Sequence, residues 1–130
     1  MRIIIGGAGR VGTGLARALR DEDKDVVLVD NSATAVKNSQ GLDVLVIHGD
    51  ITQRKKFLEA GIENAEVYVA ATNSDERNIL SCALAKHVHN EQTGGKGKLM
   101  TICRVRNPMF VEEYKLGKLS KWAGVDHVVH

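Results

Sequence analysis

The chain has 130 residues, of which 43% are hydrophobic and 26% are charged, and its formal net charge is +2 at pH 7. This length favours a single domain, residues 1–130, with a core of its own, and the near-neutral charge argues against a nucleic-acid binder. The apolar runs are too short to span a membrane, and the first strand begins too early to leave room for a signal peptide. We therefore expect no direct membrane insertion, and any membrane role must act through a partner.

Apolar, β-branched runs alternate with helical patterns along the whole chain. The expected strands are Arg2–Gly6, Val26–Asp30, Asp43–His48, Glu66–Ala71, Lys98–Val105 and Val125–Val129. The expected helices cover residues 11–20, 32–39, 52–60, 74–89 and 109–121. Strands this apolar are typical of a parallel sheet covered on both faces. Right-handed crossovers then predict a Rossmann-like, doubly wound α/β fold with six parallel strands in the order 3-2-1-4-5-6.

Several polar positions predict where the helices begin and end. Asp50 to Thr52 is expected to cap the third helix, and Asn73 to Glu76 the fourth. Gly61 is expected to close the third helix. The polar, glycine-rich stretch from Asn90 to Gly97 predicts an exposed, mobile loop.

The most informative motif follows the first strand directly and reads Gly7-Ala8-Gly9-Arg10-Val11-Gly12. The first glycine allows a tight turn, the second allows the backbone to approach a pyrophosphate, and the third allows helix and strand to pack closely. The N-terminus of the following helix offers free N–H groups to phosphates. Asp30 ends the second strand, where a carboxylate can accept hydrogen bonds from ribose hydroxyls. Strand, turn, helix and acid together predict a site for an adenine nucleotide or dinucleotide.

Each of these features also has a purely structural interpretation. Three glycines can serve a tight turn alone, although the surrounding strand, helix and acid favour nucleotide binding. Asp30 can cap the next helix, but Asn31 or Ser32 can do so instead and leave Asp30 free for a ligand.

The carboxyl ends of the other parallel strands converge on the same crevice. Gly49 follows the third strand and keeps side-chain bulk away from an adenine ring, while Asp50 can meet a base or cap a helix. The small and capping residues after the fourth strand let a nucleotide lie close to the backbone; they are Ala71, Thr72, Asn73, Ser74 and Asp75. Arg104 and Arg106 lie on the same side of the fifth strand, where an arginine can meet a phosphate, although for Arg106 we favour a solvated surface role.

The remaining chemistry-bearing residues indicate no metal or redox site. Cys82 and Cys103 each lie in an apolar stretch and are expected to be buried and reduced, as is usual for a cytoplasmic protein. The five histidines show no metal-ligand spacing.

With these residues in place, the chain resembles the nucleotide-binding N-terminal domain of Trk-type potassium-uptake regulators, also called the KTN or RCK domain. The resemblance covers essentially the whole chain. Its segments are residues 3–12, Val29-Asp30, His48-Gly49-Asp50, Leu58-Glu59-Ala60-Gly61, residues 69–78, residues 104–108 and residues 124–129. The most specific are Thr72-Asn73-Ser74-Asp75-Glu76-Arg77-Asn78 and Gly124-Val125-Asp126-His127.

The resemblance implies a ligand and a role for each matching residue. Residues 7–11 would bind the diphosphate of NAD(H), or the phosphates of ATP, ADP or AMP, and Asp30 would bind the ribose. Asp50 would flank the adenine, Thr72 and Asn73 would line the crevice, and Arg104 would reach the phosphate or the distal half of the ligand. The resemblance further implies a cytoplasmic homo-oligomer that gates a potassium-conducting membrane subunit.

The chain departs from the family's pattern at three places. Arg10 stands where glutamine is common, which adds positive charge beside the phosphates. The stretch from Asn90 to Gly97 is longer than usual, and the chain ends soon after the sixth strand, so the C-terminal subdomain of full-length regulators is absent from this sequence.

Two other functions remain open at this point. An NAD-dependent oxidoreductase needs an acid–base pair and a substrate pocket, and we find neither, because Tyr114 and Lys118 lie on the last crossover helix and His48 has no evident carboxylate partner. A gating module of another cation channel or exchanger would have the same sequence features. The aromatic residues Phe110, Tyr114 and Trp122 form a stripe on one face of the last helix, and the apolar residues on its other faces are Val111, Leu116 and Leu119. A helix that is apolar on more than one face requires a second surface, which predicts at least a homodimer through residues 109–122.

Overall fold

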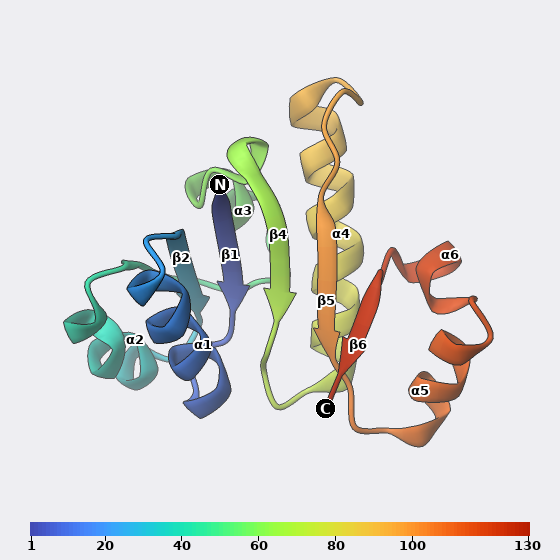
Figure 1. Ribbon diagram of the computed structural model, residues 1–130, viewed down its shortest axis with the longest axis horizontal. Helices are drawn as coiled ribbons and strands as arrows, with labels where there is room; N and C mark the ends of the chain where they lie inside the picture. Colours follow the sequence, from blue (N-terminus) through green and yellow to red (C-terminus); the bar gives the residue numbers. More distant parts are fainter.

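The computed structural model describes residues 1–130 and contains one six-stranded parallel sheet (Figure 1). The strands are β1 (Arg2–Gly6), β2 (Asp25–Asp30), β3 (Leu45–His48), β4 (Ala65–Ala70), β5 (Met100–Arg104) and β6 (His127–Val129). They pair in the order β3-β2-β1-β4-β5-β6, so the predicted doubly wound topology is confirmed. Successive strands are added to one side of β1 as far as β3 and then to its other side from β4 onward. Such sheets form a ligand crevice between the two strands where this order reverses, here β1 and β4.

Six helices connect the strands. They are α1 (Arg10–Asp21), α2 (Ala33–Ser39), α3 (Arg54–Glu59), α4 (Asp75–Thr93), α5 (Pro108–Lys115) and α6 (Leu119–Ala123). Short 3-10 helices at Gln40–Leu42 and Ile62–Asn64 complete the connections. In Figure 1, α1 and α2 lie on one side of the sheet and α4 on the other. No helix combines the length and the apolar character needed to cross a bilayer.

The central strands are buried on both faces, which explains their almost wholly apolar sequences. In β1, Ile4 belongs to a core cluster with Tyr68, whereas Ile3 and Ile5 belong to the cluster on the opposite face with Leu28. This division follows from the alternation of side chains along a strand. The Phe57 ring meets the Tyr68 ring edge to face, with centroids 5.1 Å apart.

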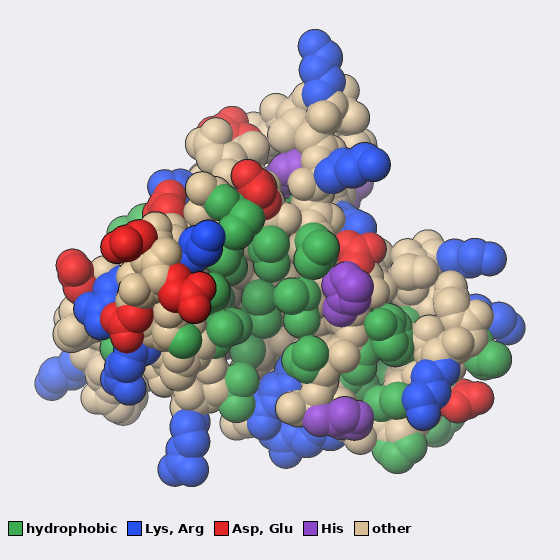
Figure 2. Space-filling model, in the orientation of Figure 1, with side chains coloured by type: hydrophobic (Ala, Val, Ile, Leu, Met, Phe, Trp, Pro, Cys, Tyr) green, Lys and Arg blue, Asp and Glu red, His purple; other side chains and the backbone are tan.

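The sheet was expected to be covered by helices on both faces, but strands β4 to β6 are left uncovered on one face. An apolar cavity of about 450 Å³ lies on the α1 side of β4 to β6, lined by residues such as Leu15, Val67, Ile102 and Val129. Figure 2 shows hydrophobic side chains gathered over these strands. The crossovers explain the asymmetry, because α1 and α2 connect β1 to β3 and leave this side of β4 to β6 uncovered.

The predicted helix over residues 109–121 is wrong in one respect, because it consists of two helices. Gly117 has φ +74°, a left-handed conformation that interrupts the helix between α5 and α6. Trp122 therefore does not continue the Phe110–Tyr114 stripe. The predicted loop over Asn90–Gly97 is also shorter than expected, since α4 continues to Thr93 and ends at Gly94 with φ +63°.

The two cysteines are buried and free, as predicted. A hydrogen bond with Cys103, together with burial, raises the pKa of the Cys82 thiol well above its usual value. The Cys82 thiol is therefore protonated at neutral pH, which makes it a poor nucleophile.

Candidate functional site

A crevice of about 780 Å³ opens at the carboxyl ends of β1 and β4. Ten of the predicted site residues line it: Gly7, Gly9, Arg10, Val11, Asp30, Asn31, Ala71, Thr72, Asn73 and Arg104. Four residues that were not predicted as ligand contacts line it as well: Ser32, Ala35, Ser74 and Arg77. Residues far apart in the sequence thus converge on one cavity, at the position that the strand order predicts.

Three helices, α1, α2 and α4, begin at the crevice, and only α1 is free to bind an anion. The N-terminus of α2 is capped by the hydroxyl of Ser32. Gly9 is the N-cap of α1 and offers no side-chain hydrogen bond, and the first turn of α1 carries no acidic residue. The N-terminus of α4, by contrast, is capped by Ser74 and carries Asp75 and Glu76 in its first turn. Uncapped N–H groups favour an anion, whereas acidic side chains repel it. The backbone N–H groups available to a phosphate are therefore those of α1, beside Arg10, and not those of α4.

The three glycines of the motif have different structural roles. Gly7 has φ +116°, and a Cβ there would meet the backbone of Ala71 and Thr72 at 2.9 Å. A Cβ on Gly12 would overlap the carbonyl of Gly7, so this glycine allows α1 to pack against the turn. A Cβ on Gly9 would meet nothing within 4 Å, which leaves open space above the turn at the crevice.

Asp30 lies at the end of β2, and its carboxylate holds the glycine turn after β1 in place. Its Oδ2 accepts the N–H of Ala8 at 2.6 Å, and its Oδ1 accepts the N–H of Ser32 at 2.7 Å. Of the two alternative caps of the next helix, Asn31 and Ser32, the structure selects Ser32, since its hydroxyl accepts the N–H of Ala35. The expectation that Asp30 is free for a ligand is therefore only partly met, because both oxygens already accept a backbone N–H. Each oxygen nevertheless keeps a lone pair for a ribose hydroxyl. Both N–H bonds also hold the carboxylate in a fixed orientation.

A buried amide joins the two strands on the other side of the crevice. The side chain of Asn78 is buried, and its Oδ1 accepts hydrogen bonds from the N–H and the hydroxyl of Thr72. Its Nδ2 donates to the carbonyls of Thr72 and Arg104. Asn78 thus fixes the ends of β4 and β5 relative to α4, although the sequence analysis gave it no separate role.

The arginine that ends β5 also faces the crevice. Arg104 Nη1 donates to Asn73 Oδ1 at 3.2 Å and to the Thr72 carbonyl at 3.3 Å. Arg106 Nη2 donates to the same Asn73 oxygen, but Arg106 is exposed and does not line the cavity. Only Arg104 can therefore reach a bound ligand, which agrees with the surface role preferred for Arg106.

Several predicted site residues do not line the crevice. Ala8 is buried and contributes its N–H to Asp30, and Gly12 packs on the turn. The space beside Gly49 is filled by the side chain of Lys56, so it is not open to an adenine ring at this point. Asp75 is buried, and its carboxylate accepts the N–H groups of Arg106 and Asn107, which ties α4 to the loop after β5.

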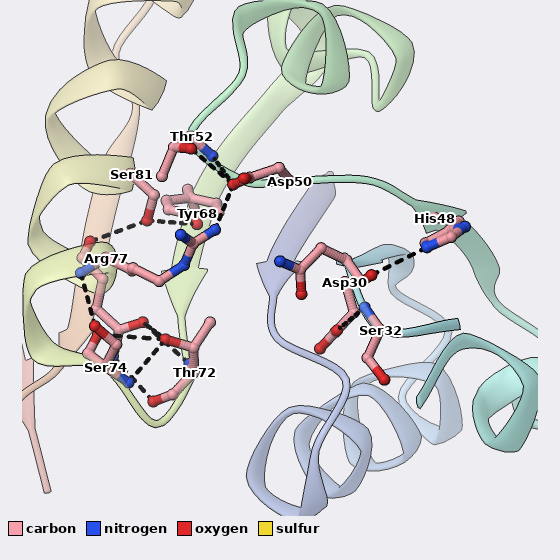
Figure 3. A network of polar contacts seen from close by, with 12 residues as sticks. Asp30, Ser32, His48, Asp50, Thr52, Tyr68, Thr72, Ser74, Arg77 and Ser81 are labelled. Carbon is pink, nitrogen blue, oxygen red and sulfur yellow. Dashed lines mark hydrogen bonds and ion pairs between the residues drawn. The ribbon is translucent and has the colours of Figure 1, made fainter. Parts of the chain in front are cut away.

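Asp50 does not line the cavity itself, but it contacts Arg77, which does (Figure 3). The expected capping of α3 is wrong, because α3 begins at Arg54 with Gln53 as an N-cap that makes no side-chain bond. Asp50 Oδ1 instead accepts the N–H and the hydroxyl of Thr52 and the Nη2 of Arg77. Burial raises the pKa of Asp50, but the Thr52 hydrogen bonds and the Arg77 charge outweigh it and lower the pKa overall. Asp50 is therefore ionised at neutral pH.

His48 points away from any acid–base partner. The backbone of His48 lies opposite that of Asp30 in the β2–β3 register, whereas its side-chain Nε2 lies 3.0 Å from the Asn31 carbonyl oxygen. This contact holds the loop after β2 in place. The one histidine near the crevice thus contacts a backbone carbonyl and not a carboxylate.

Asp126, in the second specific motif, has a structural role. Its carboxylate accepts the Thr101 N–H at 2.9 Å and pairs with Lys86 Nζ at 2.8 Å, which links β5, the start of β6 and α4. Burial raises the pKa of Asp126, but the Lys86 hydrogen bond and charge and the Thr101 hydrogen bonds lower it overall. This motif therefore positions β6 and contributes nothing to the crevice directly.

Comparison with known proteins gives one family. The model of the TrkA-N domain matches residues 3–130. The Trk system potassium uptake protein TrkA homolog of Methanothermobacter thermautotrophicus is 40% identical over 130 residues, which are 99% of this chain and 54% of that protein. The TrkA homolog of Pyrococcus abyssi is 43% identical over 109 residues, 83% of this chain and 45% of that protein. The chain thus spans about half the length of these relatives.

Solved structures share the fold. The GsuK RCK domain is 28% identical, with a TM-score of 0.71 over 98% of this chain and 24% of that chain. The GsuK channel bound to NAD has a TM-score of 0.75 at 20% identity, over 98% of this chain and 21% of that chain, and at this identity it shows the shared fold alone. The family match covers almost every residue, and the two relatives are 40% and 43% identical over most of the chain; this chain belongs to the TrkA-N domain family.

Proposed function

We propose that this chain is a single regulatory domain that binds NAD(H), or an adenine nucleotide such as ATP, ADP or AMP, and gates a membrane potassium transporter or channel. The uncapped N-terminus of α1 carries the proposal, because it lies with Arg10 in the same crevice as Asp30. This arrangement supplies N–H groups for phosphates and a carboxylate for a ribose. The potassium-uptake relatives support the choice of partner, which would hold the domain at the cytoplasmic face of the membrane.

The crevice supports binding rather than catalysis. Its titratable lining consists of Asp30 and the arginines Arg10, Arg77 and Arg104. Asp30 already accepts two backbone N–H groups, and arginine remains protonated in proteins. General acid–base catalysis needs a group that exchanges a proton near neutral pH within reach of the substrate. We therefore propose a non-enzymatic sensor.

We expect the domain to bind NADH at least about tenfold more tightly than NADPH. The fixed carboxylate of Asp30 can accept from a ribose 2′-hydroxyl, but it repels a 2′-phosphate. Titration calorimetry with both ligands measures this preference, and Asp30→Asn should reduce it. Asp43→Asn, at an exposed left-handed position outside the crevice, is the matched control. Equal or tighter binding of NADPH to the wild type would contradict the assignment of Asp30.

We also propose that the domain forms at least a homodimer through residues 109–122. Leu119 is fully buried, and Phe110, Val111 and Tyr114 pack against the domain's own core. The apolar side chains that remain exposed in this segment are Met109 (76%), Leu116 (56%) and Trp122 (58%). Three exposed apolar side chains of this size within one segment favour an interface.

Leu116→Glu should convert the dimer to a monomer, because the interface would have to bury an unpaired carboxylate. Light scattering at tens of micromolar protein measures the mass of both forms. Leu80→Glu is the control, since Leu80 is an equally exposed leucine (57%) on α4. A monomeric wild type, or a dimer lost in Leu80→Glu and kept in Leu116→Glu, would refute this interface.

A further inference from the structure

Arg77 is the one charged residue of the crevice to which the sequence motifs assign no role. It lies in the first turn of α4, and its side chain lines the crevice together with Gly7, Asp30 and Thr72. It also lines a small cavity beneath the crevice that Asp30 and Asn31 share. Figure 3 shows it extending from α4 toward Asp50. Arg77 therefore lines the crevice together with the carboxylate proposed for the ribose and with the glycine turn proposed for the phosphates.

The guanidinium of Arg77 is only partly engaged. Its Nη2 donates to Asp50 Oδ1 at 2.5 Å, and no other nitrogen of the guanidinium makes a hydrogen bond within the chain. A guanidinium carries five N–H donors in a planar fork that matches two phosphate oxygens. The side chain is 41% exposed, so its remaining donors are accessible from the crevice.

Asp50 can release Arg77 and remain ionised. Its Oδ1 also accepts the N–H of Thr52 at 2.8 Å and the hydroxyl of Thr52 at 2.7 Å, and these two bonds do not depend on Arg77. The ion pair itself is partly exposed on both sides, and such pairs contribute little to stability. Exchange of the Asp50 carboxylate for another anion therefore requires little rearrangement beyond a rotation of the Arg77 side chain.

We propose that Arg77 is a phosphate-binding residue of this site, which exchanges Asp50 for a phosphate oxygen of the bound adenine nucleotide. The proposal rests on the proposed nucleotide-binding function and adds a specificity-determining residue to it. Asp50 competes with the ligand for Arg77 in this arrangement. Binding also breaks the one ion pair between the β3–α3 loop and the first turn of α4, so occupancy of the crevice changes how these two elements are connected.

Titration of four proteins with ADP and with adenosine tests the exchange. We expect Arg77→Ala to weaken ADP binding about tenfold, which corresponds to about 1.4 kcal/mol, and to leave adenosine binding unchanged. Asp50→Asn should strengthen ADP binding by a few-fold, because it removes the competing charge and still allows the Thr52 bonds. Arg54→Ala is the matched control, because Arg54 pairs with Glu91 outside the crevice and should not affect either ligand.

The outcomes separate this inference from the function on which it rests. A wild type that binds neither ADP nor NADH contradicts the proposed function itself. If the wild type binds ADP, three results overturn the role of Arg77 alone: unchanged ADP affinity in Arg77→Ala, equal losses for ADP and adenosine, or weaker ADP binding in Asp50→Asn. Arg77→Lys, which keeps the charge and loses the fork, should retain part of the ADP affinity, and it replaces the alanine variant if that variant has a lowered thermal midpoint.

Discussion

Gly9→Val should abolish nucleotide binding and leave the free protein folded. A Cβ at this position meets nothing within 4 Å, and the backbone of Gly9 (φ −79°, ψ −164°) is extended and open to any residue. The free protein therefore accommodates the valine side chain without strain. The valine methyl groups, however, would occupy the space above the turn through which a pyrophosphate must approach the backbone. We expect affinity for NADH to fall by about two orders of magnitude or more, because an unrelieved steric clash removes the phosphate contacts as well.

Titration calorimetry with NADH measures the loss, and circular dichroism with thermal unfolding reports on the fold. Gly14→Val is the matched control, since it makes the same substitution in the same helix, also in open space, but outside the crevice. Both variants should unfold close to the wild-type midpoint, and only Gly9→Val should lose binding. Unchanged affinity in Gly9→Val would show that the phosphates do not lie at this turn.

The opposite result is expected at the third glycine of the same motif. Gly12→Ala should lower the free energy of unfolding by about 3 kcal/mol or more, because its Cβ would overlap the Gly7 carbonyl. The carbonyl cannot move away easily. Gly7 holds a left-handed conformation against the backbone of Ala71 and Thr72, and its N–H donates to the Val29 carbonyl at 2.8 Å. The clash therefore separates α1 from the sheet.

Urea unfolding followed by circular dichroism measures this difference. Gly14→Ala is again the control, and it should be neutral or should stabilise α1 by up to about 1 kcal/mol, because alanine favours a helix over glycine. A Gly12→Ala variant with the wild-type midpoint would mean that α1 sits further from the turn than the structure shows. Together the two predictions separate the binding role of Gly9 from the packing role of Gly12, within a motif of six residues.

Local patterns in the sequence were sufficient for the architecture. The order and type of the six strands, the role of Gly12, the cap at Ser74 and the burial of both cysteines all depend on neighbouring residues or on hydrophobic period. The end of a helix was harder to place. Gly117 interrupts the helix after β5, but a glycine within a helical pattern is compatible with either continuation or termination, and only the packing of Leu119 in the core selects the latter.

The crevice shows the same division. The ten predicted residues that line it belong to the glycine motif, end a strand or follow directly after one, and parallel-sheet geometry brings these positions together whatever their side chains do. The partners of the carboxylates required the tertiary structure. Asp50 and Asp75 both looked like helix caps or ligand contacts, yet Asp50 pairs with Arg77, and Asp75 accepts N–H groups of Arg106 and Asn107.

The physical reason is the distance in sequence over which these contacts form. Asp50 and Arg77 are 27 residues apart, and Asp75 and Asn107 are 32 apart, so no local periodicity relates them. Hydrophobic period and turn chemistry report the surroundings of a residue within a few positions, and they place strands, helices and the edge at which they converge. A carboxylate, by contrast, takes whichever donor the folded chain brings within about 3 Å. Only the packing of α4 against β4 and the β3–α3 loop decided that this donor is Arg77.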